Sequence, residues 1–250
     1  MDGEIIAGLL SSDIIRSNET SLFIDFGTEV IIALGSKDKV VYTRLNPEPI
    51  FAGADYSHSM RASKGAIDQI IIGDDVLTHT IQSSPASGLA VSGLLCAVSE
   101  FLSKGFIERS GKFTSKISDD DIPYAIGRRF REDERGVRFI LYSSGEKEIS
   151  IRERDIGMFL DASRQVGNEI EKLCERADIR FEDIVKIIIA GAFGVETQVQ
   201  DLNNTGIIKP VDEEKIHFIG NASLEGAVMC LLGREELSRT AKAVSLGISA

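Results

Sequence analysis

The sequence has few cysteines, and their spacing does not suit a metal cluster. Cys96, Cys174 and Cys230 are far apart and odd in number, and no Cys-x-x-Cys occurs. A disulfide framework is usually built from an even set, and an iron–sulfur cluster needs several thiolates close together. We therefore expect three thiols buried in apolar helices and no iron–sulfur cluster held by this chain alone.

Long apolar runs, internal repeats and low-complexity linkers are also missing. No run approaches the roughly 20 apolar residues of a membrane-spanning helix. The first residues, Met1-Asp-Gly-Glu-Ile-Ile, lack the basic region that begins a signal peptide. Of the 250 residues, 43% are hydrophobic, which is enough for a core without disulfides or metals. We expect a cytoplasmic chain without a membrane partner, formed of one large domain or two small lobes.

Positive charge is scarce as well. With 28 basic and 39 acidic residues the net charge is −11, which repels nucleic acid and anionic membranes. Two local basic clusters, residues 128–131 and 152–154, are interleaved with acids and indicate a solvated surface. The charge balance therefore favours a protein partner or a small ligand.

The first half of the chain has a mixed helix and strand pattern. Apolar spacing predicts a helix over residues 4–15, and alternation with turn chemistry predicts an antiparallel meander. A helix follows Gly88 and stops at Gly105, whereas residues 110–135 are polar and predict an irregular excursion. The expected strands are residues 21–26, 30–34, 39–43, 66–72, 76–81 and, as an edge strand, 138–142.

The second half alternates helices with buried strands. The longest helix is expected over residues 153–177, and strands over 185–190 and 216–219. The helix after Asn221 would place Leu224, Ala227, Val228, Leu231 and Leu232 on one face, and a final helix begins near Arg234. Strands first and strand–helix alternation afterwards give an α/β fold, a mixed sheet flanked by helices. This is the order of the ribonuclease-H-like unit, from which actin-like ATPases are built in duplicate.

A first candidate site lies at the end of a buried strand, in Asp25-Phe-Gly27-Thr28. Gly27 has no Cβ, so backbone N–H groups there can approach a phosphate, and Thr28 adds a hydroxyl donor. Asp25 could hold Mg²⁺ through water, because Mg²⁺ keeps several of its waters. The same residues also suit an ordinary hairpin turn, so the motif alone leaves both interpretations open.

A second candidate follows another buried strand, at Gly191, Ala192, Phe193 and Gly194. Small residues would let an adenosine lie against the backbone, and a close-packed turn would need the same glycines for steric reasons alone. Arg61 is a further candidate, which could either neutralise a phosphate or pair with an acid.

A third segment combines a helix cap with small residues. Asn221 is a good N-cap, whereas Gly226 weakens the following helix by roughly 1 kcal/mol. Such a sequence makes sense where another backbone packs very close, as in a helix crossing or a hinge between lobes. The residues of this segment are Gly220, Asn221, Glu225, Gly226 and Ala227.

Together these pieces resemble a known family, the C-terminal domain of the reductive activators of corrinoid-dependent methyltransferases. These activators belong to the superfamily of acetate and sugar kinases, heat-shock-protein-seventy and actin. The resemblance extends from Gly3 to about Lys242, and its most specific parts are the last two blocks. The matching blocks are residues 22–28, 51–54, 60–62, 65–67, 92–94, 190–194 and 220–227.

The resemblance implies an ATP-dependent function. Such activators use ATP to drive an electron onto an inactive Co(II) corrinoid, and the electron arrives through an iron–sulfur domain of the same polypeptide. By resemblance, Asp25, Gly27 and Thr28 match the second phosphate loop and residues 191–194 match the adenosine loop. Residues 220–227 match a connecting segment between lobes, an inter-lobe hinge. The implied cofactor is ATP with Mg²⁺, and the implied partners are a corrinoid protein and the missing activator lobe.

The sequence departs from the family at polar positions. Where the family has Asn-Gly-Glu after the threonine, this chain has Glu29-Val30-Ile31; an acid is replaced by Ala52, and Cys-Gly by Ala90-Val91. The first phosphate loop and the iron–sulfur domain are absent, so we expect no complete ATP hydrolysis by this chain alone. Three hypotheses remain: an incomplete nucleotide-binding lobe, an interaction module of the same fold that has lost ATP binding, and a kinase-like homodimer.

Overall fold

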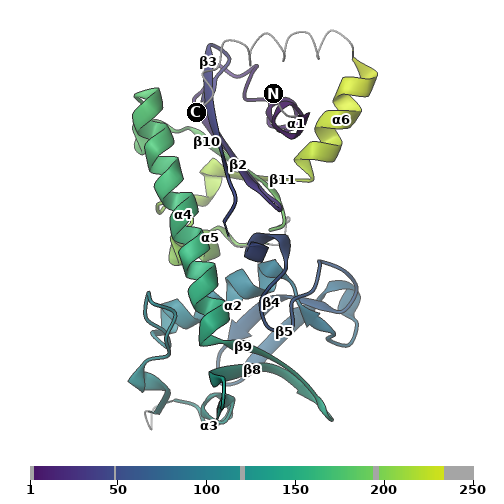
Figure 1. Cartoon of the computed structure of the whole chain (residues 1–250), viewed down its shortest axis with the longest axis vertical. Helices are drawn as coiled ribbons and strands as arrows, with labels where there is room; N and C mark the ends of the chain where they lie inside the picture. Colours follow the sequence, from purple (N-terminus) through teal and green to yellow (C-terminus); the bar gives the residue numbers. More distant parts are fainter. Residues whose placement is uncertain (1–2, 48, 119–121, 194–196, 234–250) are drawn as a thin grey trace. The chain divides into compact units, whose positions relative to one another are not determined.

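The computed structural model describes residues 3–47, 49–118, 122–193 and 197–233 (Figure 1). The chain divides into two compact units. Unit 1 comprises Met1–Pro47, Val166–Val195 and Val211–Ala250, and unit 2 comprises Glu48–Gln165 and Glu196–Pro210. Each unit is described by itself.

Unit 1 is built on a five-stranded mixed sheet. Its strands run in the order β11-β10-β1-β2-β3. Strand β1 pairs in parallel with β10 and antiparallel with β2, β10 pairs in parallel with β11, and β2 pairs antiparallel with β3. This is the ribonuclease-H-like order that the sequence predicts. The strands are β1 (Ser21–Phe26), β2 (Val30–Ser36), β3 (Lys39–Leu45), β10 (Lys186–Gly191) and β11 (Ile216–Gly220).

Helices cover both faces of this sheet. Figure 1 shows α1 (Gly3–Ser11) and α6 (Ala222–Leu232) beside one another on one face. On the other face, Glu169 of α4 (Glu153–Ala177) accepts a hydrogen bond from Thr43 of β3 at 3.2 Å. Short 3₁₀ turns, Phe181–Asp183 and Glu213–Lys215, precede β10 and β11. The core beneath α1 consists of Ile5, Leu9, Ile14, Phe23, Ile31, Ala33, Val40, Ile188, Ala190 and Ala222.

Helix α6 packs through its small residues, not through its large ones. A Cβ on Gly226 would lie 2.1 Å from the carbonyl oxygen of Ala7 in α1. The expected close approach of another backbone is therefore confirmed, as a helix crossing. The apolar face expected for this helix is exposed, since Leu224, Val228, Leu231 and Leu232 are 63%, 45%, 86% and 85% exposed. The final helix expected near Arg234 lies outside the described residues.

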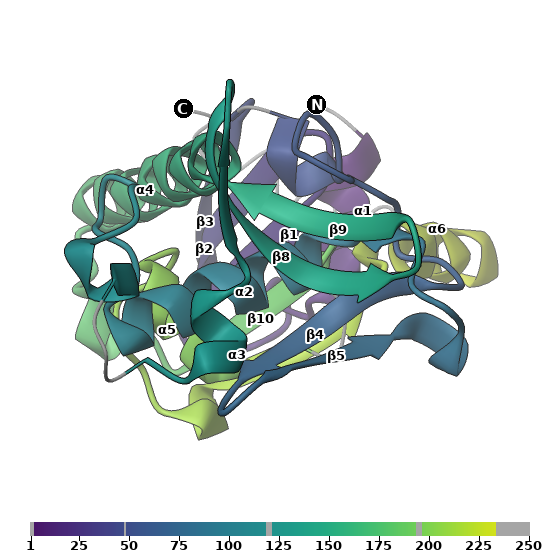
Figure 2. The ribbon, with the colours of Figure 1, turned by 90° about the horizontal axis from the view of Figure 1, so that it is seen from below.

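Unit 2 contains two three-stranded sheets. One has the order β5-β4-β6, with β4 (Ala66–Ile72), β5 (Val76–Thr80) and β6 (Gly88–Leu89). The other has the order β7-β8-β9, and its long curved β8–β9 hairpin is visible in Figure 2. The edge strand expected at residues 138–142 is wrong, because β8 lies between two partners. These strands are β7 (Phe130–Asp133), β8 (Gly136–Ser144) and β9 (Lys147–Arg152).

Helices and short turns complete unit 2. Helix α2 (Val91–Lys104) ends at Gly105, which has φ +70° and donates its N–H to Leu102, as the sequence predicts. The region 110–135 holds only short elements in its described part, among them α3 (Tyr124–Gly127). The other short helical elements of unit 2 are α5 (Val199–Thr205) and the 3₁₀ turns Pro49–Ala52, Ile81–Ser83 and Ser115–Ser118.

Packed phenylalanines hold the β7–β9 sheet of unit 2. Phe130 of β7 lies 4.8 Å from Phe139 of β8 and 5.1 Å from Phe113, measured between ring centroids. Phe139 also meets Phe101 of α2 at 5.0 Å. Edge-to-face aromatic pairs of this kind stabilise by about 0.5–1.5 kcal/mol beyond their buried area. They explain why the charged sequence of β7 forms a strand.

The three cysteines lie on helices, as expected. Cys174 is buried in α4, whereas Cys96 in α2 and Cys230 in α6 are partly buried. Burial raises the pKa of the Cys96 thiol to about 12, so it stays protonated at neutral pH. Among the described helices, none combines the length and the apolar character that crossing a membrane requires.

Candidate functional site

The predicted segments meet at one edge of the sheet of unit 1. Because β1 and β10 are parallel, their carboxyl ends coincide, and the register pairs Asp25 with Ala190 and Phe26 with Gly191. The end of β11 joins them, since Ala190 pairs with Gly220. Ligands of open α/β sheets bind at such carboxyl edges. The structure therefore brings the first, second and third candidate segments together.

Gly191 is held tightly against the end of β1. It has φ +88°, and a Cβ there would lie 2.1 Å from the Phe26 carbonyl oxygen and 2.6 Å from Oδ1 of Asp25. The same Phe26 carbonyl accepts a hydrogen bond of 2.7 Å from the N–H of Ala192. Packing thus gives a sufficient reason for a glycine at position 191.

The expected adenosine loop also includes Phe193 and Gly194. Phe193 is buried, and its ring lies 4.4 Å from that of Phe26, so it belongs to the core of unit 1. Gly194 lies outside the described residues. In the described part of this loop, Ala192 is the partly exposed residue beside Gly191.

Asp25 is the titratable group of this edge. Its side chain is half-buried, and burial, followed by the negative charge of Glu4, raises its pKa from 3.8 to about 6. At pH 7 the carboxyl is then about nine-tenths ionised. A partly buried carboxyl with a raised pKa beside a second acid is a favourable place for a cation, because the cation stabilises the charged carboxylate. Glu4 of α1 is a neighbour that sequence reasoning missed, because no local pattern links it to β1.

The turn after Asp25 is closed by its own contacts. The N–H of Gly27 donates to the carbonyl of Glu29 at 3.1 Å, and Glu29 pairs with Arg44 of β3 at 2.7 Å. Val30 is fully buried as the first residue of β2. Thr28 is exposed at the tip of this turn. The Gly27 N–H therefore already has an acceptor, and the exposed hydroxyl of Thr28 is the other polar group of the tip.

The third segment combines a cap, an open glycine and a close contact. The Asn221 side chain accepts a hydrogen bond of 2.9 Å from the Leu224 N–H, which confirms the predicted N-cap of α6. Gly220 has φ +68°, and a Cβ there would meet nothing within 4 Å. Glu225 and Ala227 are exposed, and Gly226 contacts α1. The role of an inter-lobe hinge stays a prediction.

Arg61 belongs to unit 2, whereas Asp25 and Gly191 belong to unit 1. It is exposed in the chain segment between the 3₁₀ turn Pro49–Ala52 and β4. Arg61 therefore belongs to another unit than the segments that meet at this edge, and its role stays a prediction. Within the described residues, no three His, Cys, Asp or Glu side chains gather as metal ligands.

The chain matches a model of a known protein family. The model described as "C-terminal domain of RACo the ASKHA domain" matches residues 19–247. The chain belongs to this family. The suspected resemblance is thereby confirmed, together with the actin-like fold class.

Two relatives of this ASKHA domain are longer proteins. The corrinoid activation enzyme RamQ of Eubacterium limosum is 29% identical over 227 residues, which cover 88% of this chain and 38% of that protein. A solved structure, the reductive activator for corrinoid, iron-sulfur protein, aligns with TM-score 0.89 at 30% identity. It covers 99% of this chain and 39% of its own. The chain therefore spans about two fifths of these relatives.

Proposed function

We propose that this ASKHA domain is the nucleotide-binding lobe of an ATP-dependent reductive activator of corrinoid proteins, and supports reduction of Co(II) to Co(I). The observation that carries the proposal is the meeting of Asp25 with Gly191 at the carboxyl edge of the β1–β10 pair. Family membership supplies the context of corrinoid activation. The lobe works with a partner lobe and an iron–sulfur domain, and the proposed location is the cytoplasm.

The donor set fits Mg²⁺ better than it fits a complete phosphate cradle. An Asp25 carboxylate that is mostly ionised at pH 7 suits a cation that binds one or two carboxylates and keeps its water. Bound Mg-ATP would supply the free energy for an unfavourable electron transfer. In this chain, Asp25 would orient the cation through water and Thr28 would donate to a phosphate oxygen. The N–H groups of Gly27 and Ala192 already have protein acceptors.

This shortage of free donors supports an incomplete lobe. A phosphate group is normally held by several converging N–H groups or cationic side chains. The remaining donors would come from the missing activator lobe, and a second copy of the chain is the alternative source. ATP hydrolysis by this chain alone is accordingly not part of the proposal.

A second function is favoured by the same turn. Both the Gly27–Glu29 hydrogen bond and the Glu29–Arg44 ion pair stabilise it without a ligand. A lobe of this kind would serve as an interaction module that docks a corrinoid protein and binds no nucleotide. Function lies in the site rather than in the fold, so family membership alone does not choose between the two.

Isothermal titration of ATP with Mg²⁺ into the 250-residue chain separates the two functions. The proposed lobe binds with a dissociation constant between micromolar and low millimolar, roughly −8 to −4 kcal/mol. Asp25→Asn abolishes the Mg²⁺-dependent part, whereas the exposed Asp38→Asn, which removes the same charge, leaves it unchanged. Absence of binding, also with the complementary activator lobe added, would favour the interaction module.

A further inference from the structure

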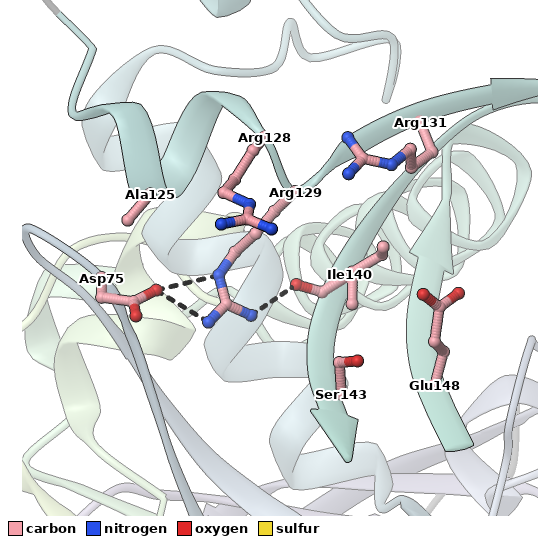
Figure 3. A pocket seen from close by; sticks show the side chains of 8 residues that line it. All are labelled: Asp75, Ala125, Arg128, Arg129, Arg131, Ile140, Ser143 and Glu148. Atoms are coloured by element: carbon pink, nitrogen blue, oxygen red, sulfur yellow. Dashed lines mark hydrogen bonds and ion pairs between the residues drawn. The ribbon is translucent and has the colours of Figure 1, made fainter. Parts of the chain in front are cut away.

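A second region of interest lies in unit 2, around the run of arginines after α3. A pocket of about 280 Å³ opens there between α3, the turn before β5, and the β8–β9 hairpin (Figure 3). Three of its lining residues are arginines, in a chain whose net charge is −11. We call it the arginine pocket; it is lined by Asp75, Ala125, Arg128, Arg129, Arg131, Ile140, Ser143 and Glu148.

Arg129 lines the arginine pocket and is held in place by hydrogen bonds. Its Nε and Nη2 donate to Asp75 at 2.9 and 2.7 Å, and its Nη1 donates to the carbonyls of Ile140 and Leu141 at 3.0 and 3.1 Å. The Val76 N–H and then Arg129 lower the pKa of Asp75, so this acid stays charged. Figure 3 shows the contacts of Arg129 with Asp75 and with Ile140. The Arg129 guanidinium is therefore already satisfied.

Arg128 and Arg131, unlike Arg129, are exposed and have no described ion pair. Both are exposed; Arg131 donates to the carbonyl of Phe130 at 2.9 Å, and Arg128 lies over the Tyr124 ring at 5.9 Å. The acid Glu148 is already paired with Arg138 at 3.0 Å. Within the described residues, which exclude 119–121, neither Arg128 nor Arg131 has an ion pair. Arg128 is close enough to Asp75 to help lower the pKa of that acid, but neither Arg128 nor Arg131 is paired with a described carboxylate.

An aromatic side chain adds an apolar element beside these charges. Tyr124 is 83% exposed, one turn before Arg128 on α3. Tyrosine and arginine are the residue types most enriched where protein partners bind tightly. The pocket is smaller than the 300–1,000 Å³ typical of small-molecule sites. Exposed arginines also hold a free anion weakly, because water and salt screen the charge.

We propose that the arginine pocket is a docking site for an acidic segment of a protein partner. Arg128 and Arg131 donate hydrogen bonds to carboxylates of the segment, and an apolar part of the segment packs on Tyr124. A folded partner adds contact area that a free anion lacks, which offsets the weakness of exposed ion pairs. The rest of this protein is acidic and repels an acidic segment, so the segment binds specifically at the arginine pocket. This inference stands apart from the nucleotide site of unit 1.

Fluorescence anisotropy with a fluorescein-labelled hexaglutamate peptide tests the proposal on the 250-residue chain. We expect saturable binding at 50 mM salt that weakens at 500 mM, because screening shortens the reach of exposed charges. The double variant Arg128→Glu/Arg131→Glu should lose at least tenfold in affinity. The double variant Lys64→Glu/Lys112→Glu, at two exposed lysines of unit 2, makes the same change in net charge and should lose less than twofold.

Two further measurements separate docking from other causes. Tyr124→Ser, which changes no charge, should weaken binding of a labelled peptide of six glutamates and one phenylalanine about threefold and leave hexaglutamate binding unchanged. Arg128→Gln/Arg131→Gln replaces the glutamate variant if that one unfolds at a lower temperature. Inorganic phosphate should compete only at tens of millimolar. The proposal is overturned if hexaglutamate does not bind, if both double variants lose affinity equally, or if phosphate competes at micromolar concentration and so marks a small-anion site.

Discussion

Gly226 of α6 lies directly against the backbone of Ala7 in α1. A Cβ at position 226 would come within 2.1 Å of the Ala7 carbonyl oxygen and 2.5 Å of its Cα. These are backbone atoms, which cannot move aside as the end of a flexible side chain can. The contact fixes the distance between the two helices that cover the Asp25 face of the sheet.

Replacing this glycine should therefore destabilise unit 1 in spite of a gain in helix propensity. Alanine is favoured over glycine inside a helix by about 1 kcal/mol, whereas overpacking costs about 1–3 kcal/mol. Gly226→Ala should lower the free energy of unfolding by about 1–2 kcal/mol, measured by urea titration. Gly3→Ala, where a Cβ meets nothing within 4 Å, should have no destabilising effect. Equal stability of both variants would refute the close approach.

Gly191 should tolerate alanine less well than another glycine of similar backbone conformation. Gly136 has φ +94° and open space around it, so Gly136→Ala reports only the conformational cost, about 1 kcal/mol. Gly191→Ala adds the clash with Phe26 and should cost a further 1–3 kcal/mol. Thermal unfolding of both variants measures the difference. Indistinguishable melting temperatures would contradict the packing of β1 against this loop.

Asp25 should make the protein less stable as the pH rises from about 4 to 6. Its pKa is about 6 in the folded protein and 3.8 without burial, so between these values the folded state holds the proton more tightly. Above pH 6 the loss is complete and amounts to at most about 3 kcal/mol. Asp25→Asn should therefore be more stable than the wild type at pH 7, with an advantage that shrinks as the pH falls toward 4.

The measurement is urea unfolding of the wild type and Asp25→Asn between pH 4.5 and 8. The exposed Asp38→Asn serves as the control for removing one negative charge. An Asp25→Asn variant that is less stable than the wild type at pH 7 would show that the carboxylate is stabilised, not strained, in the folded state.

Two neighbouring arginines should respond differently to the same conservative change. Arg129→Lys loses the paired contact with Asp75 and the bonds to two β8 carbonyls, and should cost about 1–2 kcal/mol. Arg128→Lys keeps the charge of an exposed side chain and should be neutral within about 0.5 kcal/mol. Equal losses in urea titrations would place Arg128 in the framework of unit 2 and remove it from the docking surface.

The strand boundaries of unit 1 could be predicted to within about two residues because its apolar runs are bounded by turn residues, whereas the helix expected over residues 4–15 ends at Ser11. The 21–26 strand and the 153–177 helix have the bounds that were expected. The outward orientation of the apolar face of α6 could not be predicted, because periodicity shows which residues share a face and not what that face contacts. Here a crossing helix comes so close that Ala222 and Gly226 face inward and the leucines face outward.

The candidate site was predictable where it depends on strand topology. Asp25 and Gly191 meet because parallel strands end together, which the element order implies. The arginine pocket was missed, because residues 128–131 are interleaved with acids and suggest a solvated surface. Asp75 is paired with Arg129 and Glu148 with Arg138 in the folded chain, which leaves Arg128 and Arg131 without an ion pair to a described acid.

The pairing of β1 with β10 also sets when the candidate site can form. Ser21 pairs with Lys186, so 165 residues separate two neighbouring strands. Contacts at such separation form late, since closing a long loop costs entropy before the contact stabilises anything. At 5–20 residues per second, a ribosome needs roughly 10–30 s to synthesise the chain between them. Throughout that interval the strand carrying Asp25 lacks its parallel neighbour, and the edge at which a nucleotide would bind does not yet exist.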